Sequence, residues 1–125
     1  MPRATGRRSL GQRGEALAAD YLRRIGYQVL GANFRCQWGE VDIVAMDGAT
    51  LVFVEVRTRR GASFGTPQES LTRRKQLRLI ATAETYLQEH SDAPKEWRID
   101  LVSILAGPHG SAPAIEHLRS AVQQE

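Results

Sequence analysis

Two segments, Gly39-Glu40-Val41-Asp42-Ile43-Val44 and Leu51-Val52-Phe53-Val54-Glu55-Val56-Arg57, decide the fold of this chain. Apolar residues dominate both segments, and Asp47-Gly48-Ala49-Thr50 joins them through turn-forming residues. This arrangement is typical of a β-hairpin. Acidic side chains are disfavoured in strands and are nearly excluded from buried ones. Three carboxylates on one hairpin therefore indicate that something offsets their repulsion, and a divalent metal ion is the first candidate.

The predicted hairpin gathers these charges on one face. Because side chains alternate between the two faces of a strand, Glu40 and Asp42 share a face, as do Glu55 and Arg57. A four-residue loop over residues 47–50 sets Asp42 opposite Glu55 and Glu40 opposite Arg57. A two-residue Asp47-Gly48 turn shifts the pairs but keeps the two sets together, whereas a three-residue loop separates them. The other face is predicted to be core and consists of Val41, Ile43, Ala45, Val52, Val54 and Val56.

Two interpretations of the charged face remain open from the pattern alone. Like charges opposed on a sheet destabilise it by up to about 1 kcal/mol when solvated, and by more when buried. A magnesium or manganese ion bound by two or three of the carboxylates and by water removes that cost. Alternatively, ordinary ion pairs neutralise the carboxylates, with Glu40 paired to Arg57 and Glu55 paired to Arg59.

The remaining segments predict two helices around a mixed sheet. A capping box at Ser9 and helical apolar spacing predict a first helix that ends at Gly26, and the spacing resumes from about Thr72 to His90. The order α-β-β-β-α-β, with an optional fifth strand, indicates an α/β domain whose helices pack on the sheet. We expect a basic arm over residues 1–8, one domain over 9–122, a loop over 61–66 and a turn over 107–113. The predicted strands are 27–30, 40–46, 51–57 and 97–105, with 115–118 as the optional edge strand.

Composition is that of an ordinary globular protein. The 125 residues are 42% hydrophobic and 25% charged, which fits a single domain. No apolar run approaches the roughly 20 residues of a membrane span, and no signal-length apolar stretch follows Arg7-Arg8. The single Cys36 excludes an internal disulfide and fits a reducing compartment. We therefore expect a cytoplasmic protein that does not span a membrane.

The basic residues form three groups that flank the acidic hairpin. The formal net charge is only +3, so their arrangement is more informative than their number. Basic groups around an acidic centre suit a polyanion whose phosphates approach a metal ion, although solvated arginines also serve simply to keep a protein soluble. We predict contact with nucleic acid. The groups are Arg3, Arg7, Arg8 and Arg13, then Arg57, Arg59 and Arg60, then Arg73, Arg74, Lys75 and Arg78.

The same residues carry a family resemblance. Glu15 on the first helix, Asp42 on one strand and Glu55-Val56-Arg57 on the next resemble the nuclease signature of the restriction-endonuclease-like superfamily. Within it, the chain is most similar to the small YraN-like bacterial family, which is related to archaeal Holliday junction resolvases. The similarity spans roughly residues 9–122. Further matching motifs are Tyr21-Leu22, Gly26-Tyr27, Asn33-Phe34-Arg35, Gly39-Glu40-Val41-Asp42, Tyr86-Leu87 and Arg98-Ile99-Asp100.

The resemblance implies a restriction-endonuclease-like fold and metal-dependent cleavage of DNA, including branched or junction DNA. In such a nuclease, Asp42 and Glu55 would hold Mg²⁺ or Mn²⁺, and Glu15 would bind the ion or a coordinated water. The ion would acidify a water and neutralise charge on the phosphate. Glu40 is a second candidate ligand, because it faces the same side as Asp42. Junction-resolving relatives act as dimers that cut two strands symmetrically, so the resemblance also implies a homodimer.

One departure from the superfamily pattern bears on the chemistry. Arg57 stands where the pattern has lysine, and arginine stays charged where lysine can lose a proton and act as a base. We expect Arg57 to orient the attacking water or to contact the phosphate. The presence of Arg57 also leaves two alternatives to a nuclease open. One is a non-catalytic module that binds nucleic acid with the nuclease fold, and the other is an interaction subunit whose acidic cluster is structural.

Other residues are candidates either for contact with nucleic acid or for packing in the protein interior. Related nucleases place DNA-contacting residues at the start of the second helix. Asp100 is expected to pair with Arg98 or with a helix rather than to bind a metal ion. Trp38 and Trp97 could stack on unpaired bases, although packing in the core or at its rim is the favoured interpretation. The predicted nucleic-acid contacts are Arg59, Arg60, Arg73, Arg74, Lys75 and Gln76.

Overall fold

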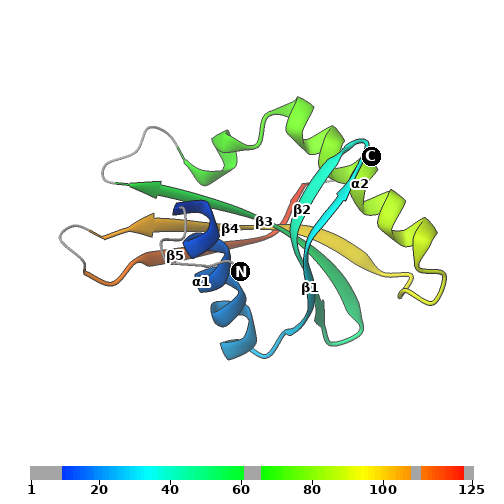
Figure 1. Cartoon of the computed structure of the whole chain (residues 1–125), viewed down its shortest axis with the longest axis horizontal. Helices are drawn as coiled ribbons and strands as arrows, with labels where there is room; N and C mark the ends of the chain where they lie inside the picture. The colour runs from blue at the N-terminus through cyan, green and yellow to red at the C-terminus, as the bar shows by residue number, and fades with distance from the viewer. Residues whose placement is uncertain (1–9, 61–65, 108–110, 123–125) are drawn as a thin grey trace, which may run out of the picture.

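The computed structural model describes residues 10–60, 66–107 and 111–122. Within these ranges, one five-stranded sheet lies between two α-helices (Figure 1). None of the described helices is long and apolar enough to cross a membrane. Along the chain the elements are α1 (Leu10–Arg24), β1 (Gln28–Cys36), β2 (Gly39–Asp47), β3 (Thr50–Arg60), the short 3₁₀ helix η1 (Pro67–Ser70), α2 (Arg73–Glu89), β4 (Trp97–Ala106) and β5 (Ala114–Val122).

The sheet is mixed, as predicted. Its strands lie in the order β1-β2-β3-β4-β5, with β3 and β4 parallel and the other neighbours antiparallel. A parallel pair needs a crossover connection, and α2 supplies it between β3 and β4. The fold is therefore the predicted α/β arrangement, and the optional fifth strand exists. β3 lies at the centre of the sheet and carries Glu55 and Arg57.

Each face of the sheet has its own hydrophobic core. One core packs against α2 and includes Phe53, which is fully buried. The other packs against α1 and includes Leu22 from that helix. The α2-side core contains Val41, Val44, Leu51, Phe53, Leu71, Leu79, Ala83, Ile99, Leu101 and Val122, and the α1-side core contains Ala18, Leu22, Tyr27, Ile43, Ala45, Val52, Val54, Val102 and Ile104.

Gly14 allows α1 to approach the sheet closely. A Cβ atom at this position would overlap the hydroxyl group of Thr58 on β3. Only a glycine permits this contact without moving a neighbour. The close approach places the next residue, Glu15, over the end of the hairpin that carries the acidic residues.

The two outer strands are longer than their sequence patterns predicted. β1 reaches Cys36 rather than Leu30, and its pairing with β2 shifts between Val29 and Gly31. A bulge of this kind interrupts the alternation on which sequence prediction depends. Asn33 further disguises the strand, because its φ of 57° is typical of turns. β5 likewise extends beyond the predicted 115–118.

Four predictions fall on residues that the structure does not describe in full. The basic arm over residues 1–8 and the cap at Ser9 lie outside the described ranges. Most of the predicted loop over 61–66 also lies outside them. The predicted 107–113 turn is described only at its ends.

Candidate metal centre

The β2–β3 hairpin has the predicted register but a tighter turn. Met46 pairs with Leu51, as a four-residue loop requires, and Asp47 also pairs with Thr50, so that only Gly48-Ala49 connects the strands. The β2–β3 ladder ends at the pair of Ile43 and Val54. Beyond this pair, the acidic ends of the two strands separate.

The carboxylate of Asp42 replaces the missing backbone pairing. Its Oδ2 atom accepts a hydrogen bond from the Val56 N–H at 2.7 Å. Val41, predicted to belong with Ile43, instead packs in the α2-side core. That prediction was wrong because strict alternation fails where β2 leaves β3. The separation of the strands leaves room between them for polar groups that a regular ladder would exclude.

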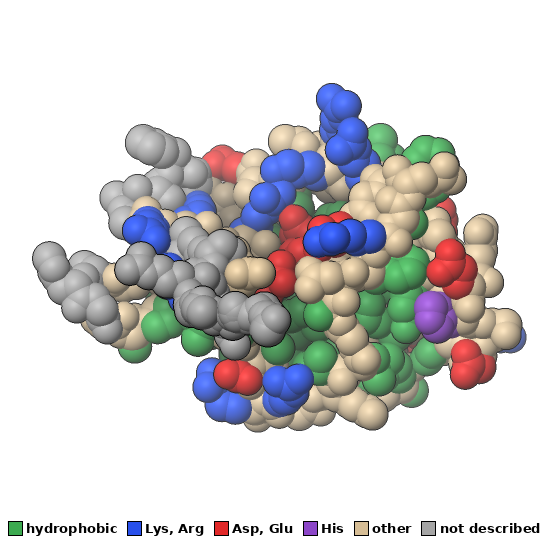
Figure 2. Space-filling model, viewed as in Figure 1, with side chains coloured by type: hydrophobic (Ala, Val, Ile, Leu, Met, Phe, Trp, Pro, Cys, Tyr) green, Lys and Arg blue, Asp and Glu red, His purple; other side chains and the backbone are tan. Residues whose placement is uncertain are grey.

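Three carboxylates from two elements converge at this separation. One oxygen from each of Glu15, Glu40 and Asp42 lies within 4.8 Å of the others, and all three residues are half-buried. Glu55 joins the group, because protonated Asp42 donates a hydrogen bond to the Glu55 carboxylate. Acidic side chains gather near the middle of the face shown in Figure 2, with basic side chains beside them. The structure thus brings together all four predicted metal-binding residues.

Burial and mutual repulsion raise the pKa of these acids. Burial raises the pKa of Asp42 to about 7, assisted by the neighbouring charges of Glu55 and Glu40. Burial also raises the pKa of Glu55, against the lowering effect of Arg57 and Lys75. The pKa of Glu15 is raised by burial and then by the charges of Asp42 and Glu40. The centre resists carrying its full negative charge unless a cation joins it.

Arginine side chains flank the carboxylates without neutralising all of them. Arg35 Nε lies 3.3 Å from Glu40 Oε1, and Arg57 Nε lies 3.3 Å from Glu55 Oε2. The predicted Glu40–Arg57 pair was wrong, because the longer β1 sets Arg35 directly opposite Glu40. Arg57 Nε is buried, and its contact with Glu55 does not meet hydrogen-bond geometry. A buried N–H without an acceptor is costly, so this atom is ready to donate to a ligand.

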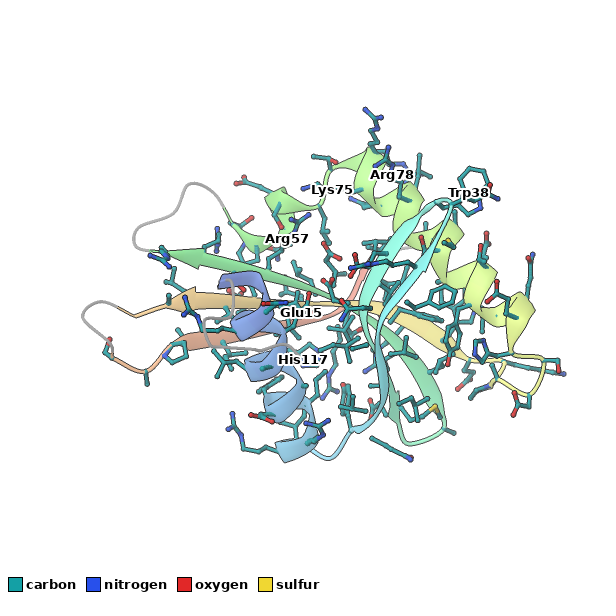
Figure 3. The ribbon with its side chains drawn as sticks, in the orientation of Figure 1. Glu15, Trp38, Arg57, Lys75, Arg78 and His117 are labelled. Atoms are coloured by element: carbon teal, nitrogen blue, oxygen red, sulfur yellow. The ribbon has the colours of Figure 1, made fainter. Side chains whose placement is uncertain are left out.

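A cavity of about 150 Å³ opens beside the carboxylates, between β2, β3 and α2. Thr72 caps the start of α2 by accepting a hydrogen bond from the Lys75 N–H, and this turn brings Lys75 to the cavity wall. Figure 3 shows Arg57, Lys75 and Arg78 following one another along this side of the molecule. The cavity is lined by Gly39, Glu40, Glu55, Arg57, Lys75, Arg78 and Leu79. Anionic and cationic groups thus share one small space, which suits a metal ion together with a phosphate.

The predicted nucleic-acid contacts occupy different surroundings. Lys75 lines the cavity, whereas the amide of Gln76 donates to the Leu71 carbonyl at 2.9 Å and supports the start of α2. Arg73 and Arg74 are exposed on the same turn. At the end of β3, Arg59 is half-buried and Arg60 is exposed.

Sequence reasoning missed two residues of the centre. Arg35 pairs with Glu40, and the Asn33 side chain forms a hydrogen bond with Glu15 that lowers the pKa of that acid. Both residues lie on the part of β1 beyond Leu30 that was not predicted as a strand. The motif Asn33-Phe34-Arg35 was the available signal, because it belongs to the family resemblance.

A second polar network lies under α1 and is built around Asp100. Its carboxylate is fully buried and accepts from Arg98 Nε at 2.9 Å, as predicted, and from the Ser120 N–H at 3.0 Å. His117 Nε2 lies 2.8 Å from Asp100 Oδ2, and its Nδ1 lies 3.0 Å from the Tyr21 hydroxyl. Because a carboxylate only accepts, His117 donates from Nε2 to Asp100. This network joins β4, β5 and α1, and it is separate from the carboxylate centre.

Known proteins share this sequence over nearly its whole length. The chain is 49% identical to a UPF0102 protein of Roseiflexus castenholzii over 123 residues, covering 96% of this chain and 98% of the relative. It is 47% identical to a UPF0102 protein of Rhodococcus opacus over 113 residues, covering 90% and 95% of the two chains. The model of the family described as "Uncharacterised protein family UPF0102" matches residues 14–104. The chain therefore belongs to the UPF0102 family, as the YraN-like resemblance predicted.

Proposed function

We propose that this protein is a divalent-metal-dependent endonuclease that acts on DNA, and on branched or junction DNA in particular. One observation carries the proposal: carboxylate oxygens of Glu15, Glu40 and Asp42 lie within 4.8 Å of one another. They lie beside a cavity that also holds Glu55, Arg57 and Lys75. Acidic ligands next to cationic groups are the complement of a metal ion and a phosphodiester.

The chemistry of these ligands suits Mg²⁺ or Mn²⁺. Both ions prefer carboxylate and water oxygens. The raised pKa values of Asp42, Glu55 and Glu15 further support the assignment, because a bound cation relieves the repulsion that contributes to them.

Each residue has a distinct role in this proposal. Asp42 and Glu55 hold the ion, Glu15 binds it or a coordinated water, and Glu40 is a further ligand. When bound, the ion would supply an acidified water and neutralise charge on the phosphate.

The two cations at the cavity wall contribute differently. Arg57 donates its buried Nε–H to a phosphate oxygen, which satisfies a group that otherwise lacks a hydrogen-bond acceptor. Because its guanidinium stays protonated, Arg57 stabilises charge rather than acting as a base. Lys75, on the opposite wall, holds the same phosphate as a flexible cation.

A second function is favoured by one specific residue. Arg57 stands where the superfamily pattern has lysine, and a site without that base fits a module that binds nucleic acid without cutting it. Both functions require the basic surface, so binding alone does not separate them. A homodimer is proposed for the nuclease only, because two strands of a symmetric junction require two sites.

Cleavage assays separate the two functions. The full chain is incubated with a four-way junction and with linear duplex, in Mn²⁺, in Mg²⁺ and in EDTA. We expect metal-dependent cleavage that falls about 100-fold or more in Asp42→Asn, on the scale of removing one group that stabilises the transition state. Arg57→Lys is expected to retain cleavage, because it restores the superfamily residue.

Binding without cleavage would identify the non-catalytic module that binds nucleic acid. Junction DNA that is bound but stays uncut with either metal, and whose binding weakens steeply with salt, would contradict the nuclease and support the second function. Arg57→Lys then serves as a further check, because gain of cleavage in that variant would show that the base alone is missing.

A further inference from the structure

Trp38 is an exposed aromatic side chain at the tip of the β1–β2 turn. It is 51% exposed, and among the exposed large apolar side chains of the described ranges it is the aromatic one. Trp97, by contrast, packs edge-on against Phe53 with 5.6 Å between ring centroids. The favoured prediction of packing therefore describes Trp97 but not Trp38. Much of the Trp38 indole is therefore accessible to a ligand.

Trp38 lines a groove of about 580 Å³ whose other walls carry charge. This volume falls within the ~300–1,000 Å³ typical of small-molecule sites. Arg35 and Arg78 both line the groove, and the side chain of Arg35 is 73% exposed even though its Nε atom faces Glu40. Gly39 brings the turn against α2, because a Cβ there would come 3.4 Å from Thr82 Oγ1. An indole ring and two guanidinium groups that line one groove match a nucleobase and its phosphates.

The groove is continuous with the candidate metal centre. Glu40 belongs to both, and Gly39 and Arg78 line the groove as well as the smaller cavity that contains Glu55. Figure 3 shows Trp38 beyond Arg78 and Lys75 on the same side of the molecule. A nucleotide in the groove would thus be a close neighbour of a phosphate held at Arg57.

We propose that this groove binds one unpaired nucleotide of the DNA substrate, with its base stacked on the Trp38 indole and its phosphates on Arg35 and Arg78. The inference rests on the proposed function, because it names the substrate form for the same site. Bases inside a duplex are already stacked on their neighbours and do not offer a free face to an indole. The proposed nuclease therefore acts next to an unpaired nucleotide, as found at a flap, a gap or the open centre of a junction. Stacking on an aromatic ring tolerates any base, so the site selects strand structure rather than sequence.

Binding measurements in EDTA test the groove independently of cleavage. Fluorescence anisotropy compares a labelled short oligothymidylate with a blunt-ended linear duplex that has no loop. Trp38→Ala is expected to weaken binding of the single strand about tenfold, the scale of losing one stacked base, and to change duplex binding by less than about twofold. Trp38→Phe is expected to retain most of the single-strand affinity, because it keeps an aromatic face.

Intrinsic fluorescence supplies a second measurement. The chain has two tryptophans, so the Trp97→Phe protein reports on Trp38 alone. Its emission is expected to be quenched by the single strand and to stay nearly unchanged with the duplex. For the binding measurements, Leu30→Ala is the control for Trp38→Ala, since Leu30 is 47% exposed and lies outside the groove. This variant is expected to bind both DNAs like wild type.

Two results would overturn the inference: single-strand binding by Trp38→Ala that equals wild type, or an equal loss on both DNAs. The failure of the proposed nuclease looks different. If no DNA is cut but Trp38→Ala still loses single-strand affinity, the groove stands as the binding site of the module. If DNA is cut and Trp38→Ala binds every DNA normally, the groove assignment alone is wrong.

Discussion

At the scale of single residues, Asp42 both stabilises and destabilises the fold. Its carboxylate accepts the Val56 N–H and so holds β3 where the ladder ends. The same carboxylate is half-buried beside Glu55, and burial followed by that neighbouring charge raises its pKa to about 7. The residue that best fits metal binding therefore destabilises the metal-free fold at neutral pH.

The direction of the pH dependence follows from this raised pKa. Between the unfolded value of 3.8 and the folded value of about 7, the folded protein binds a proton that the unfolded chain releases. Stability then falls as pH rises through this window. We expect the metal-free protein to melt at a higher temperature at about pH 5.5 than at about pH 8, as measured by circular dichroism.

Replacing Asp42 by asparagine tests the origin of this slope. The amide oxygen of the new side chain would still accept a hydrogen bond from the Val56 N–H, and its amide nitrogen would donate one to Glu55. The negative charge of Asp42 would be absent. Asp42→Asn should flatten the pH dependence and stabilise the metal-free protein at about pH 8 by on the order of 1–2 kcal/mol. Glu84→Gln, at an exposed position on α2, serves as the control. An unchanged slope in Asp42→Asn would show that another group is responsible.

At the scale of elements, α1 positions Glu15 through the contact of Gly14 with Thr58. Gly14→Ala should cost roughly 1–3 kcal/mol, the usual range for overpacking, and should weaken Mn²⁺ binding by displacing Glu15. Adding Thr58→Ala removes the overlapping hydroxyl and should recover most of both losses. Chemical denaturation and metal titration of the single and double variants measure this. A double variant no better than Gly14→Ala would mean that Thr58 does not set the position of the helix.

The Asp100 network joins β4, β5 and α1 in the same way. Burial alone would raise the pKa of Asp100, but hydrogen bonds from His117, Arg98 and the Ser120 N–H outweigh it and lower the pKa. The network therefore stabilises the fold at pH values above the ordinary pKa of an aspartate. This contribution is lost as the pH falls through the lowered pKa of Asp100. This sign is opposite to that of Asp42.

Removing the imidazole from this network should destabilise the whole domain. His117→Ala leaves a cavity and takes one donor from a fully buried carboxylate, at an expected cost of about 2–4 kcal/mol. Urea denaturation at neutral pH measures the loss. Glu116→Ala, at the exposed neighbouring position on β5, should change stability by less than about 0.5 kcal/mol. Similar values for the two variants would contradict a structural role for the network.

The elements differ in how well the sequence predicts them, for physical reasons. β3, α2 and β4 have regular periodicity, and β2 has it from Ile43 onward. Thr72 marks the start of α2 with a capping residue. β1 and β5 carry irregular registers and residues with positive φ, Asn33 and Ser120. At such positions, a side chain or the neighbouring strand decides the backbone conformation, and local pattern does not record it.

At the scale of the whole molecule, the residues of the candidate metal centre also divide into those that local pattern predicts and those that long-range packing brings together. The hairpin pattern predicted that Glu40, Asp42 and Glu55 meet, because their spacing is local. Glu15 came from the family resemblance alone, since only the packing of α1 on β3 brings it there. Arg35 and the Trp38 groove depend on the length of β1 and on its approach to α2, which the local pattern did not predict. The only sequence signals were the family motif Asn33-Phe34-Arg35 and the stacking alternative for Trp38.

Electrostatics at this scale predicts how DNA binding responds to salt. The basic residues around the cavity and groove neutralise several phosphates, so affinity for duplex DNA in EDTA should fall steeply as salt increases. The double variant Arg78→Ala/Lys75→Ala should reduce the slope by about two, one for each lost phosphate contact. Lys95→Ala, remote from the groove and the cavity, should leave the slope unchanged. A change in Lys95→Ala about half as large as that in the double variant, in proportion to the charge removed, would mean that net charge, rather than this surface, attracts the DNA.

The assignment of the carboxylate cluster as a metal centre is tested most directly by calorimetric titration of the full chain with Mn²⁺. Wild type is expected to bind the ion more tightly as pH rises through about 7, because Asp42 must lose its proton. Asp42→Asn is expected to fold and to lose this binding. Heat of binding that is absent from wild type at about pH 8, or that persists unchanged in Asp42→Asn, would contradict the assignment.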